Sequence, residues 1–366
     1  MKTLSLSRRL RRTHVSEGLE AAPIKAYSVY NRMLLPTRFI SLEEDCRHLK
    51  EAVQVWDVAS QRQVEIKGPD AADLMQRLTP RDLHGMKVGR CYYVPVVDEN
   101  GGMLNDPVAL KLSEDRFWLS LADSDLLLWV KGIVLGMGLK VDVFEPDVSP
   151  LSIQGPRAEE LVSRVFGEAI RELTFFGFEY FPFANGRFLI ARSGWSKQGG
   201  FEIYVEGNHY GMPLWDALFE AGSGLDVRPG GPNLIERVEG GLLSYGNDMT
   251  LDNTPFECGL DRFCQPDKAI SCIGREALLR EMEAGPKRKI CPMEIDGDIP
   301  DSDRAWLVYT AGNLVGQVTS AAKSRDFGTN VAIAMLDRGF WEAGRELSVE
   351  TPTGMLSARV VDKFWN

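Results

Sequence analysis

Two segments of this chain place acidic side chains where strand-like runs meet tight turns. In residues 93–106, a β-rich run ends at Asp98 and turns through Asn100, Gly101 and Gly102. Asp106 follows where the next strand should begin. A carboxylate beside a tight turn is well placed to meet a ligand. The alternative role for Asp106 is to cap the turn through its own side chain.

The second segment, residues 192–206, is a glycine-bearing loop followed by a strand-like run. The loop carries Trp195 and Lys197, and its glycines allow a ligand to approach closely. Trp195 could face a ligand cation, whereas a Trp in such a loop is more often a packing residue. In the run that follows, Glu202, Tyr204 and Glu206 share one face because strand side chains alternate. A solvated face is the alternative for Glu202.

Composition limits the class of protein. With 366 residues, 44% of them hydrophobic, the chain fits two or three domains of an ordinary globular protein. The net charge of −10 argues against a nucleic-acid partner, which would require a basic face. Five basic residues near the N-terminus are the exception, and we expect either a solvated arm or a subunit contact of a homodimer there. They are Lys2, Arg8, Arg9, Arg11 and Arg12.

Several site types have no sequence signature. The six cysteines form no C-x-x-C pair and the four histidines are isolated, so we predict no metal site and reduced, buried thiols. Neither a P-loop nor a dinucleotide fingerprint is present. The richest apolar run, residues 126–139, is broken by Lys131 and is shorter than the roughly 20 residues of a membrane span. Without a signal-peptide pattern at residues 13–25, we expect a cytoplasmic protein without a membrane partner.

Helical and strand-like segments are mixed along the chain without a repeat, which predicts an α+β protein. Asp70 is expected to cap a helix, and the Ala284-Gly285-Pro286 sequence marks the clearest boundary. Beyond it the chain is β-rich and punctuated by glycine, as in a small barrel. The other expected elements are strands at 64–66 and 116–122 and helices at 71–78, 124–134, 158–166 and 232–244.

Longer motifs carry a family resemblance. After Tyr93, Gly101-Gly102 and Asp106 come SIQGP (152–156), SGWSKQGGFEI (193–203), ERVEGGLLSYGND (236–248), TPFECGLDRF (254–263), IGREAL (273–278) and VGQVTSAAKS (315–324). In this order they resemble the tetrahydrofolate-dependent aminomethyltransferases, the glycine-cleavage T-protein family, over nearly the whole chain. The uninterrupted RSGWSKQGG and LLSYGNDMTLDNTPFECGLD are most similar to the family members that demethylate dimethylsulfoniopropionate.

The resemblance implies a three-lobed, T-protein-like α+β fold that binds folate and ends in a β-barrel domain. We expect the folate-binding region to cover residues 1–285 as two interleaved lobes, with residues 52–140 as the inserted lobe. The barrel domain should cover residues 286–366.

The resemblance also implies site residues, with tetrahydrofolate as the methyl acceptor. Asp106 would act near the folate reaction centre, as the catalytic residue. Tyr93 and Phe176 would wall the pterin unless they fill a core, and Arg237 would contact folate unless it forms an ordinary ion pair on a helix face. Glu202 would bind the amino-pyrimidine edge. On the substrate side we nominate Trp195, Lys197, Tyr30, Ser120 and Tyr204.

The departures from the family pattern bear on the substrate. Lys197 stands in a loop where the T-protein typically carries an acid, Asn105 replaces the first of two aspartates, and Ala122 replaces an asparagine. An aminomethyl-lipoyl substrate is therefore disfavoured, and a small cation with a carboxylate tail is favoured. Glycine betaine or dimethylglycine would also meet that description. A folate-binding protein without activity is a third option, but residues 242–246 lack the reactive cysteine of such relatives.

Overall fold

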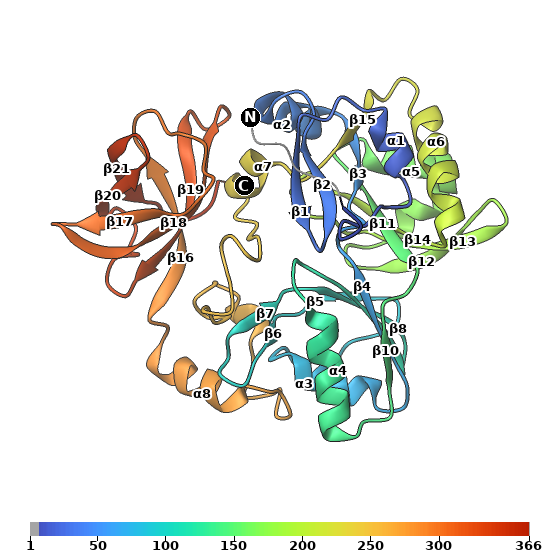
Figure 1. The fold of residues 1–366 in the computed structure, drawn as a ribbon, viewed down its shortest axis with the longest axis horizontal. Coiled ribbons are helices and arrows are strands. Elements are labelled where there is room, and N and C mark those ends of the chain that lie inside the picture. The colour runs from blue at the N-terminus through green and yellow to red at the C-terminus, as the bar shows by residue number, and fades with distance from the viewer. Residues whose placement is uncertain (1–6, 366) are drawn as a thin grey trace.

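The computed structural model describes residues 7–365, so Lys2 of the basic N-terminal segment lies outside the described residues. Figure 1 shows three lobes, built on a five-stranded sheet, a six-stranded sheet and a closed barrel. The α+β class and the separate C-terminal barrel are therefore confirmed.

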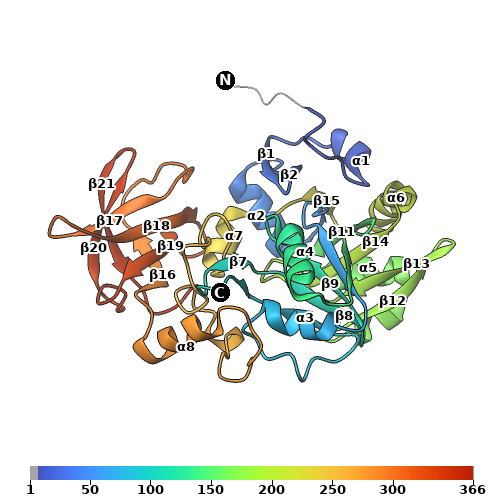
Figure 2. The same cartoon turned by 60° about the horizontal axis from the view of Figure 1, so that its bottom comes forward.

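The five-stranded sheet has the order β10-β4-β9-β8-β5. Helices α3 (Ala71–Leu78) and α4 (Leu126–Met137) lie together on one side of it (Figure 2). Leu74 and Leu78 on α3, and Leu126 and Val130 on α4, are buried against the sheet because each pair is four residues apart and so shares one helix face. The strands are β4 (Gln63–Lys67), β5 (Cys91–Tyr93), β8 (Val108–Ser113), β9 (Arg116–Ser120) and β10 (Asp142–Phe144).

The six-stranded sheet has the order β12-β13-β14-β11-β3-β15. Helices α5 (Ala158–Phe166) and α6 (Gly211–Ala221) cover one face, and the other face packs on the five-stranded sheet through a shared apolar cluster that includes Trp118 and Tyr204. The strands are β3 (Val53–Asp57), β11 (Val148–Gln154), β12 (Phe178–Phe183), β13 (Gly186–Ala191), β14 (Gly200–Glu206) and β15 (Val227–Gly230).

The barrel closes in the order β16-β19-β18-β17-β20-β21. Helix α7 (Leu234–Glu239) packs its buried Ile235 and Val238 onto the barrel surface, while α8 (Arg275–Ala284) leads into the first barrel strand. The division of the chain at residue 285 stays a prediction. The barrel strands are β16 (Arg288–Ile295), β17 (Trp306–Thr310), β18 (Asn313–Ser324), β19 (Thr329–Asp337), β20 (Glu346–Thr351) and β21 (Gly354–Val360).

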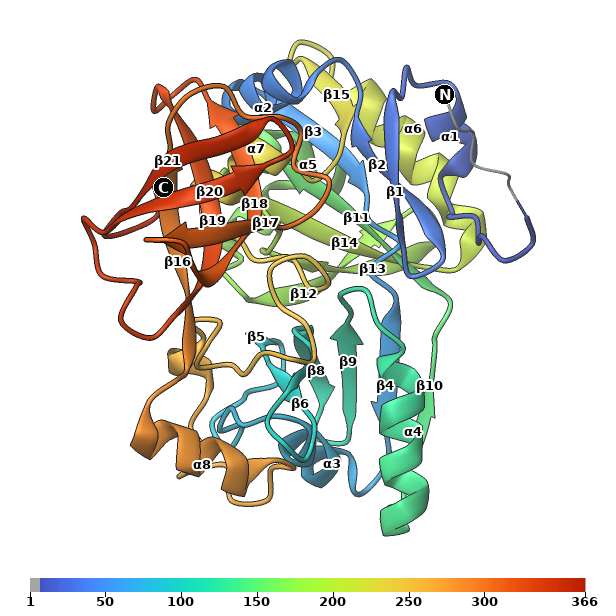
Figure 3. The ribbon, with the colours of Figure 1, turned by 60° about the vertical axis from the view of Figure 1, so that its left-hand side comes forward.

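A two-stranded hairpin of β1 (Ala26–Tyr30) and β2 (Met33–Arg38) stands beside the six-stranded sheet. Its turn points toward the lobe of the five-stranded sheet, as Figures 1 and 3 both show. A second small hairpin pairs β6 (Val96–Val97) with β7 (Met103–Asn105). The remaining elements are α1 (Ser16–Glu20), α2 (Leu42–Glu51), η1 (Glu168–Glu172), η2 (Asn208–Tyr210) and η3 (Asp261–Phe263).

The structure corrects several expected local features. The predicted helix at 232–244 is only Leu234–Glu239, because Asn233 caps its start and Gly241 takes a left-handed φ of 62° after its end. Asp70 occupies the N-cap position of α3, but its carboxylate accepts from the Lys140 N–H at 2.7 Å instead of capping. The helix expected at 124–134 begins at Leu126, and the strand expected at 116–122 ends at Ser120.

Two other expectations concern cysteines and membrane spans. All six cysteines are buried and unpaired, as predicted. Between residues 7 and 365 no helix has the length and apolarity needed to cross a bilayer.

Candidate active site

Asp106 lies between β7 and β8 with its carboxylate enclosed by protein. The Tyr93 hydroxyl donates a hydrogen bond to Asp106 Oδ2 at 2.9 Å. Asp106 Oδ1 is buried and has no hydrogen-bond partner among residues 7–365. Leaving a buried acceptor unpaired is unfavourable, so this atom is suited to meet a ligand.

The tight turn before Asp106 has a different cap. Asp98 Oδ1 accepts hydrogen bonds from the N–H groups of Asn100 and Gly102, each at 2.8 Å. The turn-capping role that was the alternative for Asp106 therefore belongs to Asp98, and that alternative is wrong.

The charge of the Asp106 carboxylate acts on three tyrosines. Burial raises the pKa of Asp106 to about 7, against the opposing effect of the Tyr93 hydrogen bond. The pKa values of Tyr30, Tyr93 and Tyr245 are all raised, first by burial and then by the negative charge of Asp106. The structure thus brings the predicted residue Tyr93 into contact with Asp106 and places the predicted residue Tyr30 within range of its charge. Sequence reasoning missed Tyr245, although it lies within the motif at 236–248.

Strand register places Ser120 at the same end of the five-stranded sheet as Asp106. Tyr93 pairs with Val108, Val108 with Ser120, and Ser120 with Gln63, so all four residues lie at one end of the five-stranded sheet. Asp106 lies two residues before Val108, at the same end. The Gln63 amide donates to Ser120 Oγ at 3.0 Å.

Glu202 and Tyr204 occupy alternate positions of β14, on the face that packs against the five-stranded sheet. The Tyr204 ring lies 5.8 Å from that of Trp118, and its buried hydroxyl lies beside the side chains of Glu202 and Ser120. Glu202 accepts from the Ser193 hydroxyl, and burial raises the pKa of Glu202. A solvated face for Glu202 is therefore wrong, since only 5% of the residue is exposed.

Phe176 lies at the edge of the same inter-sheet cluster. Its backbone has a left-handed φ of 59°, and its carbonyl accepts from the Cys91 N–H at 2.8 Å. The ring stacks on Phe175 with 4.4 Å between centroids, while the Tyr93 ring packs 5.0 Å from Phe263. Both predicted pterin walls thus have aromatic neighbours that fix their orientation.

Trp195, Lys197 and Arg237 form a group at α7 and the barrel. The Arg237 guanidinium lies 6.0 Å from the centre of the Trp195 ring. The Lys197 N–H donates to Glu236 Oε1 at 2.7 Å, and its side chain is exposed. These contacts run to α7, whereas those of Asp106 run to the five-stranded lobe.

Arg237 is part of a buried network rather than an exposed helix-face pair. It is 7% exposed and donates to Asp248 Oδ2 at 2.8 Å and to Ser320 Oγ at 2.6 Å. The ion pair that was the alternative for Arg237 is therefore present, with Asp248 as the partner, but it is buried rather than on an exposed helix face. Arg237 instead connects α7 to the loop after it and to the barrel.

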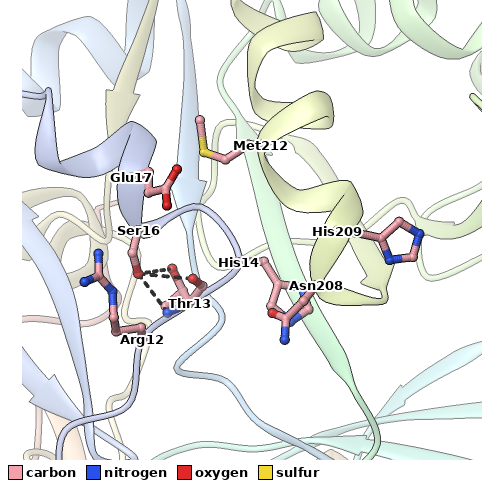
Figure 4. A pocket seen from close by; sticks show the side chains of 8 residues that line it. All are labelled: Arg12, Thr13, His14, Ser16, Glu17, Asn208, His209 and Met212. Atoms are coloured by element: carbon pink, nitrogen blue, oxygen red, sulfur yellow. Dashed lines mark hydrogen bonds between the residues drawn. The ribbon is translucent and has the colours of Figure 1, made fainter.

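A separate pocket of about 280 Å³ lies where the N-terminal segment meets α6 (Figure 4). His14 within it contacts Asp147 through Nε2 at 3.2 Å, and burial lowers the pKa of His14. None of the predicted site residues lines this pocket. Its lining residues are Arg12, Thr13, His14, Ser16, Glu17, Asn208, His209 and Met212.

Comparison with known proteins agrees with this architecture. The GCVT N-terminal domain family model matches residues 17–268, and the glycine cleavage T-protein C-terminal barrel domain matches residues 288–365. The chain therefore belongs to the glycine-cleavage T-protein, or aminomethyltransferase, family.

Two individual relatives and one solved structure are similar to this chain over nearly its whole length. The dimethylsulfoniopropionate demethylase DmdA of Ruegeria pomeroyi is 56% identical over 365 residues, covering 100% of both chains. An aminomethyltransferase of a Thermoanaerobacter species is 28% identical, covering 95% of this chain and 97% of the relative. The glycine cleavage aminomethyltransferase T of Bartonella henselae has the same fold, with a TM-score of 0.88 at 23% identity and 98% coverage of both chains.

Proposed function

We propose that this chain transfers a methyl group from dimethylsulfoniopropionate to tetrahydrofolate, forming methylmercaptopropionate and 5-methyltetrahydrofolate. The full-length relative at 56% identity carries this conclusion. The buried, partly unpaired Asp106 carboxylate adds a chemical reason, because it offers negative charge in an enclosed site.

The reaction requires alignment more than acid-base catalysis. The carbon–sulfur bond breaks with its electron pair staying on sulfur, so the leaving group is a neutral thioether that needs no proton. The lone pair of a tetrahydrofolate nitrogen that carries one hydrogen forms the new carbon–nitrogen bond, and the methylated nitrogen then releases that proton to water to give 5-methyltetrahydrofolate. Positive charge leaves sulfur during the transfer, and a fixed carboxylate can stabilise it at its new position. Near-attack geometry and exclusion of water supply the rest.

A buried polar atom supports a fit to a ligand. Asp106 Oδ1 is an acceptor without a partner among residues 7–365. We assign Asp106 the catalytic role. We assign Tyr93, Phe176, Glu202 and Arg237, together with Asp106, to folate, and Tyr30, Ser120, Trp195, Lys197 and Tyr204 to the methyl donor.

One assay tests the proposal. The purified protein is incubated with tetrahydrofolate and dimethylsulfoniopropionate, and both products are measured. The same incubation with glycine betaine or dimethylglycine tests the other cationic donors. Product from one of those alone would replace the proposed substrate, and folate binding without product from any donor would favour a binding protein.

The pH dependence of activity should follow the ionisation of the Asp106 carboxylate. Its folded pKa is raised to about 7, so the carboxylate is ionised above that pH and neutral below it. If the ionised form stabilises the transferred charge, kcat/KM rises from about pH 6 to pH 8 and then levels off. The rise should disappear in Asp106→Asn, and its survival there would assign the titration to another group.

Lys197 tests recognition of the substrate carboxylate. Lys197→Ala should raise the KM for dimethylsulfoniopropionate about tenfold or more, because a hydrogen bond between charged groups contributes roughly 1.5 to 3 kcal/mol. The KM for folate should stay nearly constant. Lys131→Ala, an exposed lysine on α4, serves as the matched control. An unchanged KM in Lys197→Ala would place the carboxylate elsewhere.

Assembly and location are also proposals. The basic N-terminal segment suits a contact between two copies, so we propose a homodimer in the cytoplasm. Light scattering of the full chain and of a variant with Arg8, Arg9 and Arg12 changed to Ser tests the contact. Equal masses for both would remove this role from the segment.

A further inference from the structure

The turn of the β1–β2 hairpin reaches the end of the five-stranded sheet where Asp106 lies. Its two central residues, Asn31 and Arg32, have φ angles of 48° and 64°, as a tight two-residue hairpin turn requires. The strand before the turn is open to solvent, with Tyr27 and Val29 about half exposed at 48% and 49%. Within the turn, Asn31 is buried, at 6% exposed, whereas the Arg32 side chain is exposed.

Asn31 ties this turn to two strand ends. Its N–H donates to Asp123 Oδ1 at 2.7 Å, and its side-chain amide donates to the carbonyls of Ser60 at 2.9 Å and Ala122 at 3.1 Å. Ser60 lies in the connection from β3 to β4, and Ala122 follows β9 of the five-stranded sheet. The Asn31 side chain therefore fixes the hairpin turn to the β3–β4 connection and to the end of β9.

A second asparagine meets Asn31 at Ala122. The Asn105 amide donates to the same Ala122 carbonyl at 3.0 Å, and Asn105 Oδ1 accepts from the Ala122 N–H at 3.0 Å. Asp106 directly follows Asn105, and Tyr30 directly precedes Asn31. The two asparagines thus set the relative position of Tyr30 and Asp106 through one shared backbone group.

We propose that Asn31 is a positioning residue that holds Tyr30 beside Asp106 so that the methyl donor is bound between the hairpin turn and the sheet end. This inference rests on the proposed methyl transfer. Asn31 itself acts through Tyr30, because its backbone and side-chain N–H donors are occupied by Asp123, Ser60 and Ala122.

The test is a cycle of variants measured with dimethylsulfoniopropionate and tetrahydrofolate. Asn31→Gly keeps the left-handed turn and removes the amide, so the KM for the donor should rise about tenfold, with less than about a twofold change in the folate KM. Added to Tyr30→Ala, the same change should have no further effect, because neighbours that act as a unit are not additive.

Arg32→Gly is the matched control. It makes the same substitution in the same turn, but the Arg32 side chain is exposed, so both KM values should stay within about twofold of wild type. Should Asn31→Gly not fold, Asp123→Ala replaces it and Asp123→Asn, which keeps an acceptor, is its control.

Two outcomes would overturn the inference. The first is an equal rise in the KM for the donor and the KM for folate, or an effect of Asn31→Gly that adds fully to that of Tyr30→Ala. Either result would mean that Asn31 only stabilises the fold. A wild-type protein that forms no product from dimethylsulfoniopropionate would instead refute the proposed function, so the two failures are distinguishable.

Discussion

Asp106→Asn should lower kcat about a hundredfold or more while the protein stays folded. The Asp106 carboxylate raises the pKa of three tyrosines and has one buried oxygen without a partner among the described residues. Removing one fixed charge or donor from a preorganised site typically lowers kcat by about 10² to 10³. Asparagine is nearly isosteric and keeps an acceptor for the Tyr93 hydroxyl, so thermal unfolding should shift little.

Asp98→Asn is the control for this result. It makes the same change eight residues earlier, where the side chain accepts two backbone N–H groups and an asparagine oxygen can do the same. We expect near wild-type turnover. Full activity in Asp106→Asn, measured as 5-methyltetrahydrofolate formed, would remove Asp106 from the catalytic role and leave it as a packing residue paired with Tyr93.

Local patterns in the sequence predicted the elements that pack by their own periodicity. The helices at 71–78 and 158–166 have the predicted bounds, since each buries an apolar stripe against one sheet. The bounds of α7 also had local signals, Asn233 as a cap and Gly241 as a stop, which the prediction of 232–244 did not use. Tertiary packing adds a constraint that no local pattern reveals, because a side chain at Gly241 would lie 2.4 Å from the ring of Phe364.

The site was only partly accessible from sequence. Alternation along β14 placed Glu202 and Tyr204 on one face, but which face is buried depends on the packing of two sheets. The hydrogen bonds of Asn31 to Ser60 and Ala122 were not predicted, although an asparagine between two strand-like runs is a signal for a left-handed turn. Its partners Ser60 and Ala122 lie 29 and 91 residues away, so the contacts themselves could not be foreseen.

Arg237→Ala should reduce the free energy of unfolding by about 3 to 5 kcal/mol. The substitution leaves the Asp248 carboxylate buried without its cation, and breaking one side of a buried ion pair has about this effect. Asp248 keeps hydrogen bonds from the Ser244 N–H and from the hydroxyls of Thr319 and Ser320. These connect the loop to the barrel, so the loss should appear as a lower urea midpoint.

Two further variants separate stability from folate binding. Asp248→Asn in the Arg237→Ala background removes the stranded charge and should recover much of the loss. Arg359→Ala breaks an exposed barrel pair with Glu294 and should change stability by less than about 1 kcal/mol. If Arg237→Ala instead leaves the urea midpoint unchanged and raises the folate KM, then Asp248 tolerates its isolation and the guanidinium serves the ligand. A combined loss would mean that the residue joining α7 to the barrel also contacts folate, so that binding and lobe association depend on one side chain.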